Sequence, residues 1–251
     1  MFNSSELLRL LPMLKGKFHY SEEMESSNDL AAELVKSGAD SGTLVLAESQ
    51  TKGRGRGGNV WRCPKGEGLL FSLVVDPDFE RELWPRLALA AGLAVAEAID
   101  SYGIEAEIKW PNDVWINGRK CAGILVEGCE DKVIVGVGLN VSTLIFPDPI
   151  EKSATSIQRE GVQMVSREKL LADVVRGIFQ WGSRCGAGFS DVVGAVNARC
   201  ALRGEMIQLR RESELLTGMM AGVSELGYLL LERGDGVEQI VQADEIRKLR
   251  D

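Results

Sequence analysis

TKGRGRGGNVWRCPKG, residues Thr51–Gly66, carries five positive charges and no negative one in a chain whose formal net charge is -8. Three of its glycines match G-x-G-x-x-G, the pattern of the dinucleotide-binding fold, in which a helix begins at the third glycine. The ten residues after that glycine include a proline and two glycines and have no helical period, so no helix is expected there. The match is therefore accidental, and we interpret the stretch as a loop between two strands.

This loop has the composition of an anion-binding site. Glycine N–H groups can approach an anion closely, and Arg54 and Arg56 can form paired hydrogen bonds to phosphate or carboxylate oxygens. The alternative is a flexible, solvated glycine-arginine tract. We favour a binding loop because the tract is short, contains Trp61 and lies between the strand-like runs Thr43–Ala47 and Leu69–Val75.

The rest of the chain predicts an α+β fold, with a mixed, largely antiparallel sheet and flanking helices. Helices are expected at 30–35, 85–102, 167–181 and 187–199, and further strands at 105–110, 114–116, 120–127 and 132–141. The first helix has Ser26 or Ser27 as its N-cap. From Gly204 onward, short strands at even spacing predict a small β-barrel of about 50 residues. We therefore expect two domains, 1–203 and 204–251.

Composition excludes several classes of protein. The acidic balance argues against general nucleic-acid binding, which needs many basic contacts with phosphates. No stretch is long enough to cross a membrane, and the first fourteen residues lack the pattern of a signal peptide, so a cytoplasmic protein is expected. The five cysteines are odd in number and include no C-x-x-C pair, which favours reduced thiols over disulfides or a structural zinc site.

A lysine and an aspartate are expected to meet on one face of a hairpin. Asn117-Gly118 is a strong hairpin signal, and a two-residue turn fixes the register of its strands. Lys120 and Asp113 then lie diagonally on the same face, within reach of a lysine side chain. The alternative is an edge ion pair that contributes little stability. A binding role is favoured because Pro111 interrupts ladder pairing and presents the residues after it at a turn.

The strand Lys132–Val141 has one apolar face and one almost bare face. Gly136, Gly138 and Asn140 alternate with valine and leucine, so they share the bare face. Glycines within a strand often mark the close approach of a ligand, and Asn140 offers both a donor and an acceptor. A β-bulge explains two glycines equally well.

Six motifs occur along the chain in this order: Ser26-Ser27-Asn28, Gln50 with Gly53-Arg54-Gly55-Arg56, Trp61, Lys109-Trp110-Pro111-Asn112-Asp113, Lys120–Glu127 and Gly136–Val141. Together they resemble the biotin–protein ligase family, and the resemblance covers nearly the whole chain. It implies the class II synthetase-like fold of biotin and lipoate ligases, with an SH3-like C-terminal β-barrel. It also implies the monofunctional type, without an N-terminal DNA-binding domain.

The resemblance implies a two-step reaction with ATP, biotin and Mg²⁺. Biotin's carboxylate attacks the α-phosphate of Mg-ATP to give biotinoyl-5′-AMP and pyrophosphate, and a lysine of a biotin carboxyl carrier protein then takes the biotinoyl group. Arg54, Arg56 and Lys120 would offset the repulsion between the two anionic substrates and stabilise charge on the phosphoryl oxygens. Asp113 would help to hold these cations or a metal, whose ligands the sequence leaves unknown.

The resemblance also divides the binding residues along the site. Lys120 would lie near biotin's carboxylate, and Lys109 joins the binding set through its motif. The other positions are Ser26, Ser27, Asn28, Gln50, Gly53, Arg54, Gly55 and Arg56 at the biotin end, Gly123 and Gly136 along the pocket, and Trp61, Asn112 and Asn140 at the adenylate.

Two positions depart from the family's loop. Gly57 and Asn59 stand where the family has further basic residues, so weaker retention of the adenylate is expected.

A lipoate or octanoate ligase of the same fold is the alternative enzyme, although its different arginine-glycine motif is not found. A non-catalytic biotin- or nucleotide-binding regulator is a second alternative, disfavoured because binding alone does not need Lys120. We also expect a homodimer formed through the main sheet, with the barrel free to contact the carrier, and no nucleic-acid or membrane partner.

Overall fold

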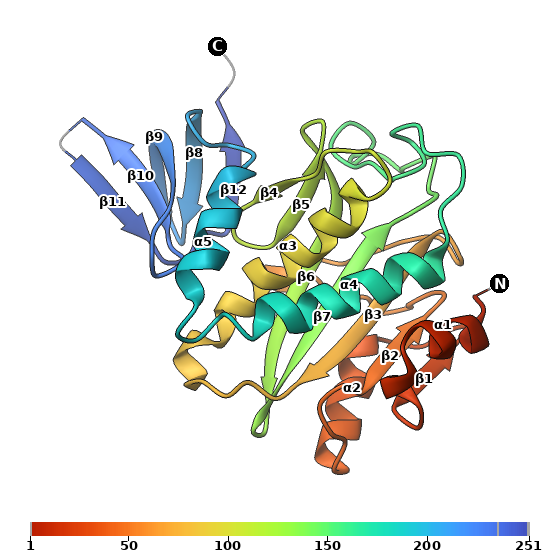
Figure 1. The fold of residues 1–251 in the computed structure, drawn as a ribbon. Helices are drawn as coiled ribbons and strands as arrows, with labels where there is room; N and C mark the ends of the chain where they lie inside the picture. Colours follow the sequence, from red (N-terminus) through yellow and green to blue (C-terminus); the bar gives the residue numbers. More distant parts are fainter. Residues whose placement is uncertain (1, 235, 250–251) are drawn as a thin grey trace.

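The computed structural model describes residues 2–234 and 236–249. A seven-stranded sheet with helices on both faces forms the larger part, and a five-stranded sheet follows it (Figure 1). One continuous hydrophobic core joins the two, because Val196 and Leu202 belong to the same cluster as Leu93 of the first part and Leu209 of the second. The expected boundary between two domains, at residues 203 and 204, stays a prediction.

The large sheet has the order β1-β2-β3-β7-β6-β5-β4. Only β1 and β2 pair in parallel among its described ladders, so the expected mixed, largely antiparallel sheet is confirmed. Its strands are β1 Phe18–Ser21, β2 Leu44–Ala47, β3 Gly68–Val75, β4 Glu107–Lys109, β5 Asp113–Ile116, β6 Arg119–Cys129 and β7 Lys132–Asn140.

Helices cover the two faces of this sheet unequally. Alternate residues of β7, such as Val133 and Val135, pack under α3 (Leu87–Asp100) and α4 (Arg167–Gly182), which lie side by side in Figure 1. The opposite face, including Ile134, packs against the single helix α2, Ser27–Lys36. The remaining helices are α1 Ser4–Leu10 and α5 Phe189–Ala198, with 3-10 turns at Pro12–Leu14, Arg56–Gly58 and Arg81–Arg86. The face that carries only α2 leaves room for a site.

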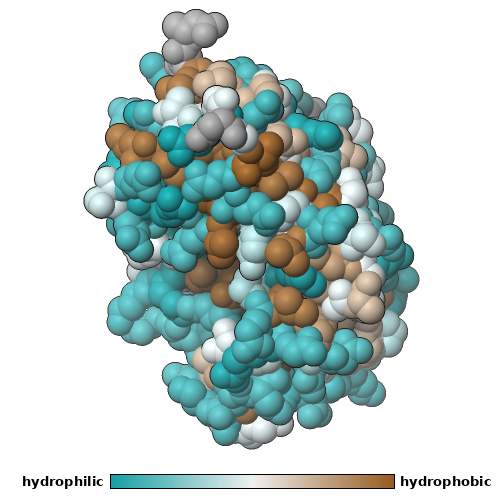
Figure 2. Space-filling view, turned by 90° about the vertical axis from the view of Figure 1, so that its left-hand side faces the viewer, coloured by the Kyte–Doolittle hydropathy of each residue, from teal (hydrophilic) through white to brown (hydrophobic). Residues whose placement is uncertain are grey.

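The C-terminal strands form a five-stranded antiparallel sheet of order β11-β10-β9-β8-β12. A small C-terminal β domain was expected and is confirmed, although the described ladders include no β11–β12 pairing that would close a barrel. Figure 2 shows this side of the molecule, where apolar side chains form separate patches within a mostly hydrophilic surface. The strands are β8 Met206–Arg211, β9 Glu214–Val223, β10 Leu229–Arg233, β11 Gly236–Ile240 and β12 Glu245–Lys248.

The elements around the glycine loop agree with the sequence. Ser26 caps α2, and β2 and β3 flank the loop. Within the loop only a single 3-10 turn forms, in which Gly57 has a φ of 65°, so the dinucleotide-binding reading is excluded. None of the described helices is both long and apolar enough to cross a membrane.

Candidate active site

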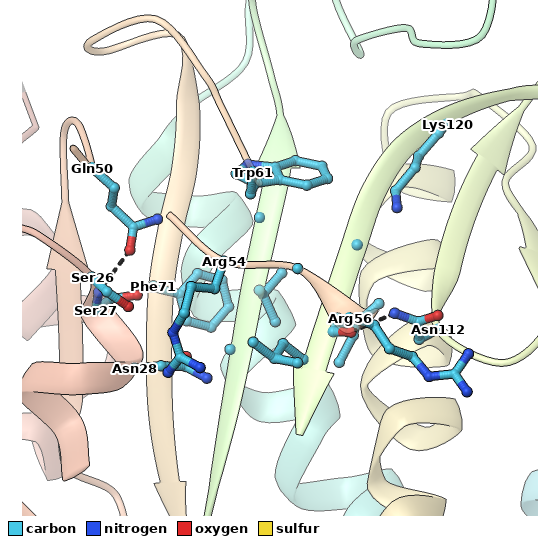
Figure 3. A pocket seen from close by; sticks show the side chains of 17 residues that line it. Ser26, Ser27, Asn28, Gln50, Arg54, Arg56, Trp61, Phe71, Asn112 and Lys120 are labelled. Atoms are coloured by element: carbon cyan, nitrogen blue, oxygen red, sulfur yellow. Dashed lines mark hydrogen bonds between the residues drawn. The ribbon is translucent and has the colours of Figure 1, made fainter. Parts of the chain in front are cut away.

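A narrow cavity of about 40 Å³ lies on the α2 side of the sheet (Figure 3). It runs from the start of α2 across β3, β7 and β6 to the β5–β6 hairpin, and the glycine loop covers it. Twelve residues expected from the sequence line it: Ser26, Ser27, Asn28, Gln50, Arg54, Gly55, Arg56, Trp61, Asn112, Lys120, Gly123 and Gly136. The lining also includes Phe71, Ile124, Leu125, Val137 and Gly138.

The α2 end of the cavity is a buried polar cluster. The Gln50 carbonyl oxygen accepts a hydrogen bond of 2.7 Å from the Ser27 backbone N–H. The Ser72 hydroxyl lies 2.7 Å from Ser27 Oγ and 2.5 Å from Asn28 Oδ1. Asn28 Nδ2 donates in turn to Glu127 Oε2 at 2.7 Å. These side chains are fixed by one another, so this end is preorganised to bind a small polar group.

The two glycines of β7 make space for side chains that cross the sheet. A Cβ atom on Gly136 would lie 2.2 Å from Asn28 Oδ1, and one on Gly138 would lie 2.4 Å from the indole of Trp61. The pairing of β7 with β3 and β6 continues through both glycines without a register shift. Close approach, and not a β-bulge, therefore explains them.

Trp61 forms the upper wall of the cavity. Its backbone N–H donates to the Gly53 carbonyl at 3.0 Å, and its indole lies between Gly138 and Gly123. The buried indole Nε1 has no hydrogen-bond partner within the described structure. An unpaired buried donor costs free energy, so a ligand acceptor that reached this N–H would gain a favourable hydrogen bond.

The other end of the cavity carries the expected lysine–aspartate pair. Lys120 Nζ lies 2.6 Å from Asp113 Oδ1 and 5.5 Å from the centre of the Trp61 ring. The turn between their strands is the expected one, with φ of 50° at Asn117 and 72° at Gly118. These values suit the type I′ turn of a two-residue hairpin.

Lys109 extends this cationic region. It is opposite Asp113 in the β4–β5 ladder, and its amine lies 4.8 Å from the centre of the Trp115 ring. Burial lowers the pKa of Lys109, an effect that Asp113 opposes and Lys120 reinforces. Lys109 and Asp113 face a second hollow, of about 650 Å³, between the glycine loop and the C-terminal strands.

The two arginines of the loop are already engaged by protein groups. Arg54 forms two parallel bonds with Glu127, of 2.7 and 2.9 Å, and a third of 2.7 Å with Asp29. Arg56 donates to the Ala243 carbonyl at 2.8 Å, and burial lowers its pKa. An anionic ligand that binds Arg54 must therefore compete with the carboxylates of Asp29 and Glu127.

Gly53 and Asn140 lie outside the cavity lining. Gly53 lines a hollow beside the loop, where a Cβ atom would lie 2.5 Å from the Trp61 carbonyl oxygen. Asn140 is buried, and its Nδ2 donates to the Thr155 carbonyl at 3.1 Å. The contact between Asn140 and an adenylate stays a prediction, since this amide holds the chain segment after β7.

Sequence reasoning missed the two acidic partners of Arg54. Asp29 and Glu127 were visible as charges beside two of the motifs, but their pairing depends on how α2 and β6 lie in the fold. No group of three or more His, Cys, Asp or Glu side chains placed to hold a metal occurs among the described residues. A Mg²⁺ ion that keeps its waters and binds mainly substrate phosphates does not need such a group.

Comparison with known proteins agrees with this geometry. Residues 20–142 match the model of the biotin/lipoate A/B protein ligase family. The bifunctional ligase/repressor BirA of Bacillus subtilis is 33% identical over an alignment of 234 residues that covers 90% of this chain and 72% of that protein. The chain belongs to the biotin–protein ligase family. The resemblance inferred from the motifs is thus confirmed.

Further members of the biotin–protein ligase family extend the match. The biotin--[acetyl-CoA-carboxylase] ligase of Mycobacterium tuberculosis is 32% identical over 225 residues, covering 85% of this chain and 82% of that protein. The structure of the Aquifex aeolicus biotin protein ligase in complex with biotin and ATP has a TM-score of 0.84 at 31% identity, covering 93% of this chain and 99% of that chain. The expected fold of biotin protein ligases is confirmed.

Proposed function

We propose that this chain is an ATP-dependent biotin–protein ligase. It activates biotin as biotinoyl-5′-AMP and transfers the biotinoyl group to a lysine of a biotin carboxyl carrier protein. The observation that carries the proposal is Lys120, whose amine lies 2.6 Å from Asp113 at one end of a cavity, with the neutral polar side chains of Ser27, Asn28 and Gln50 at the other. A molecule with an uncharged polar head and a carboxylate tail fits this arrangement.

In the first step a carboxylate oxygen of biotin bonds to the α-phosphorus of ATP, and the bond to pyrophosphate breaks. Both reactants are anionic, so their approach is unfavourable without a nearby cation. Lys120 supplies that charge at the junction of carboxylate and phosphate, and Asp113 holds its amine in place. Trp61 and Gly123 line the cavity beside Lys120, so substrates that fill it would displace water from this charge and strengthen the interaction.

ATP would be used with Mg²⁺ bound to its phosphates. Asp113 is the carboxylate paired with Lys120 in the described structure, and it has further lone pairs that can orient a water bound to the ion. We propose no direct set of protein ligands for the ion. Magnesium would neutralise phosphate charge while Lys120 acts on the carboxylate side.

The acceptor lysine belongs to a partner, which we propose to be a biotin carboxyl carrier protein. The hollow beside Lys109 and Asp113 opens toward Arg210 and Glu245 of the C-terminal strands. A lysine side chain that enters through it would reach the Lys120 end of the cavity. Homodimerisation through the main sheet and a cytoplasmic location remain predictions from the sequence.

The direct test is to incubate the protein with biotin, ATP and Mg²⁺ and to detect biotinoyl-AMP by mass. Parallel reactions with lipoate and octanoate separate the proposal from the alternative acyl ligases. We expect biotinoyl-AMP in the first reaction and at most traces of the other adenylates. Absence of every adenylate, or preference for lipoate or octanoate, would refute the proposed substrate.

A further inference from the structure

The carboxylate of Glu160 is buried between two segments that meet near Lys120. Its side chain is only 5% exposed. Oε2 accepts a bond of 2.7 Å from Asn117 Nδ2, and Oε1 accepts one of 2.6 Å from Arg119 Nη2 and another from the Thr155 hydroxyl. Glu160 therefore joins the turn of the β5–β6 hairpin to the segment that follows β7.

That segment holds the backbone of Lys120 directly. The Lys120 N–H donates to the Ser153 carbonyl at 2.8 Å, and the Lys120 carbonyl accepts from the Thr155 N–H at 2.9 Å. These two bonds form a short parallel bridge between Lys120 and Ala154. The backbone position from which the lysine side chain extends is thus set on one side by residues 153–155.

The β5–β6 ladder on the other side of Lys120 is irregular at this point. Lys120 is opposite Trp115, but Ala122 is opposite Val114, so Cys121 has no counterpart on β5. A bulge of this kind locally weakens pairing and redirects side chains. Residues 153–155 therefore supply support that β5 alone does not give.

Thr155 is the point where these bonds converge. It is fully buried, its hydroxyl donates to Glu160, and its carbonyl accepts from Asn140 Nδ2 at 3.1 Å. Glu160 and Asn140 thus hold Thr155 from two directions, while the Thr155 N–H holds Lys120. The buried charge is compensated by three donors, as a buried carboxylate requires.

We propose that Glu160 is a positioning residue for Lys120, which acts by fixing the backbone of residues 153–155 and the hairpin turn against each other. This inference rests on the proposed ligase function. Glu160 does not line the cavity, so it acts on the reaction through Lys120 and not on either substrate. A displacement of about 1 Å at a charge-stabilising group can slow a reaction on the order of a hundredfold.

The test is the single-turnover rate of biotinoyl-AMP formation in Glu160→Gln. This substitution keeps the shape of the side chain but replaces one carboxylate oxygen by an NH2 group, which cannot accept a hydrogen bond. Asn117 and Arg119, which donate to different oxygens of Glu160, can then no longer both keep their bonds. We expect the rate to fall about tenfold or more, with the dissociation constant of biotin alone changed less than about threefold. Hydrogen exchange at the Lys120 amide should become faster, while exchange in the β6–β7 ladder at Leu125 stays unchanged.

The same substitution in the Lys120→Ala background separates positioning from general stability. If Glu160 acts through Lys120, the double variant forms biotinoyl-AMP at the same rate as Lys120→Ala alone. An equal slowing in both backgrounds would overturn the inference, as would a rate within twofold of wild type in Glu160→Gln alone. Wild-type protein that forms no adenylate would instead refute the proposed function.

Two other variants complete the test. Glu151→Gln is the matched control, because Glu151 pairs with Arg159 at 2.6 Å in the same region and has no bond to the hairpin in the described structure. Its rate should remain within twofold of wild type. If Glu160→Gln does not fold, Arg119→Ala removes one donor at the partly exposed turn. A fall of about threefold that vanishes in the Lys120→Ala background supports the inference, and an unchanged rate overturns it.

Discussion

The indole of Trp61 occupies the space that a side chain at position 138 would need, since a Cβ atom on Gly138 would lie 2.4 Å from Cε2 of the ring. Trp61 belongs to the glycine loop, whereas Gly138 lies two residues before the end of the central strand β7. The loop can therefore close over the sheet only because this strand residue is a glycine. The relationship connects the composition of β7 to the shape of the cavity.

Gly138→Ala should displace Trp61 and slow adenylate formation by about tenfold or more, because the cavity wall is lost. The strand itself accepts alanine, and the loop can move aside, so the free energy of unfolding should change by less than about 2 kcal/mol. Rates of biotinoyl-AMP formation and denaturant unfolding measure the two effects. Gly194→Ala in α5 is the control, since a Cβ there meets nothing within 4 Å and should stabilise the helix by about 0.5–1 kcal/mol. A wild-type rate in Gly138→Ala would contradict this account.

Ligand should protect the glycine loop, 51–64, from proteolysis. Ordering its glycines is entropically costly, and Arg54 is held only by partly exposed carboxylates. Trypsin, which cleaves after its arginines, should therefore cut this loop more slowly when biotin and ATP are added. Equal cleavage rates with and without saturating ligand would show that the loop is not ordered by binding.

The buried ion pair between Glu48 and Arg167 should make the free energy of unfolding depend on pH. Burial alone would raise the pKa of Glu48, but hydrogen bonds from Arg167, Tyr20 and the Phe2 N–H outweigh it and hold the pKa below its ordinary value. The stability from this pair is thus present above the unfolded-state pKa of about 4.3 and is lost as the pH falls through the lower folded-state pKa.

Arg167→Met should leave Glu48 buried without its cation and lower the free energy of unfolding by about 3 kcal/mol at pH 7. Without Arg167, burial favours the neutral form of the Glu48 carboxyl. As the pH falls from about 5 to about 3 this carboxyl becomes protonated in both proteins, so the difference in the free energy of unfolding between variant and wild type should shrink. Thermal unfolding across that range measures it. A deficit that stays constant with pH would mean that Glu48 is not the group responsible.

The sequence predicted most of the elements around the site, but not all of the sheet. β2, β3, β6 and β7 have strong apolar or alternating patterns, and the Asn117-Gly118 turn fixed the register that brings Lys120 to Asp113. β1 and β12 were not predicted. Each has four residues without clear alternation and lies at a sheet edge, where pairing with an existing strand decides the conformation.

The partners of the site residues were harder to predict than the residues themselves. Arg54 was expected to bind an anion, but Asp29 and Glu127 lie 25 and 73 residues away and meet it only in the folded chain. Glu160 lies 40 positions beyond Lys120, outside every motif, and its connection runs through backbone bonds that no sequence pattern shows.

A homodimer is expected from family resemblance, formed through the main sheet. Sedimentation at micromolar concentration, with and without biotin and ATP, should show the mass of two chains in at least one condition. A monomer in both conditions would contradict the expectation.

Lys120→Ala tests the central claim most directly. The ion pair with Asp113 is partly exposed, so its loss should cost about 1 kcal/mol or less and the variant should melt near wild type. Biotinoyl-AMP formation should fall on the order of a hundredfold or more, because a charge-stabilising group is lost. Lys132→Ala, at the far end of β7 and paired with Asp131, should change neither quantity. A rate in Lys120→Ala within about threefold of wild type, equivalent to about 0.6 kcal/mol, would show that Lys120 is not the catalytic cation.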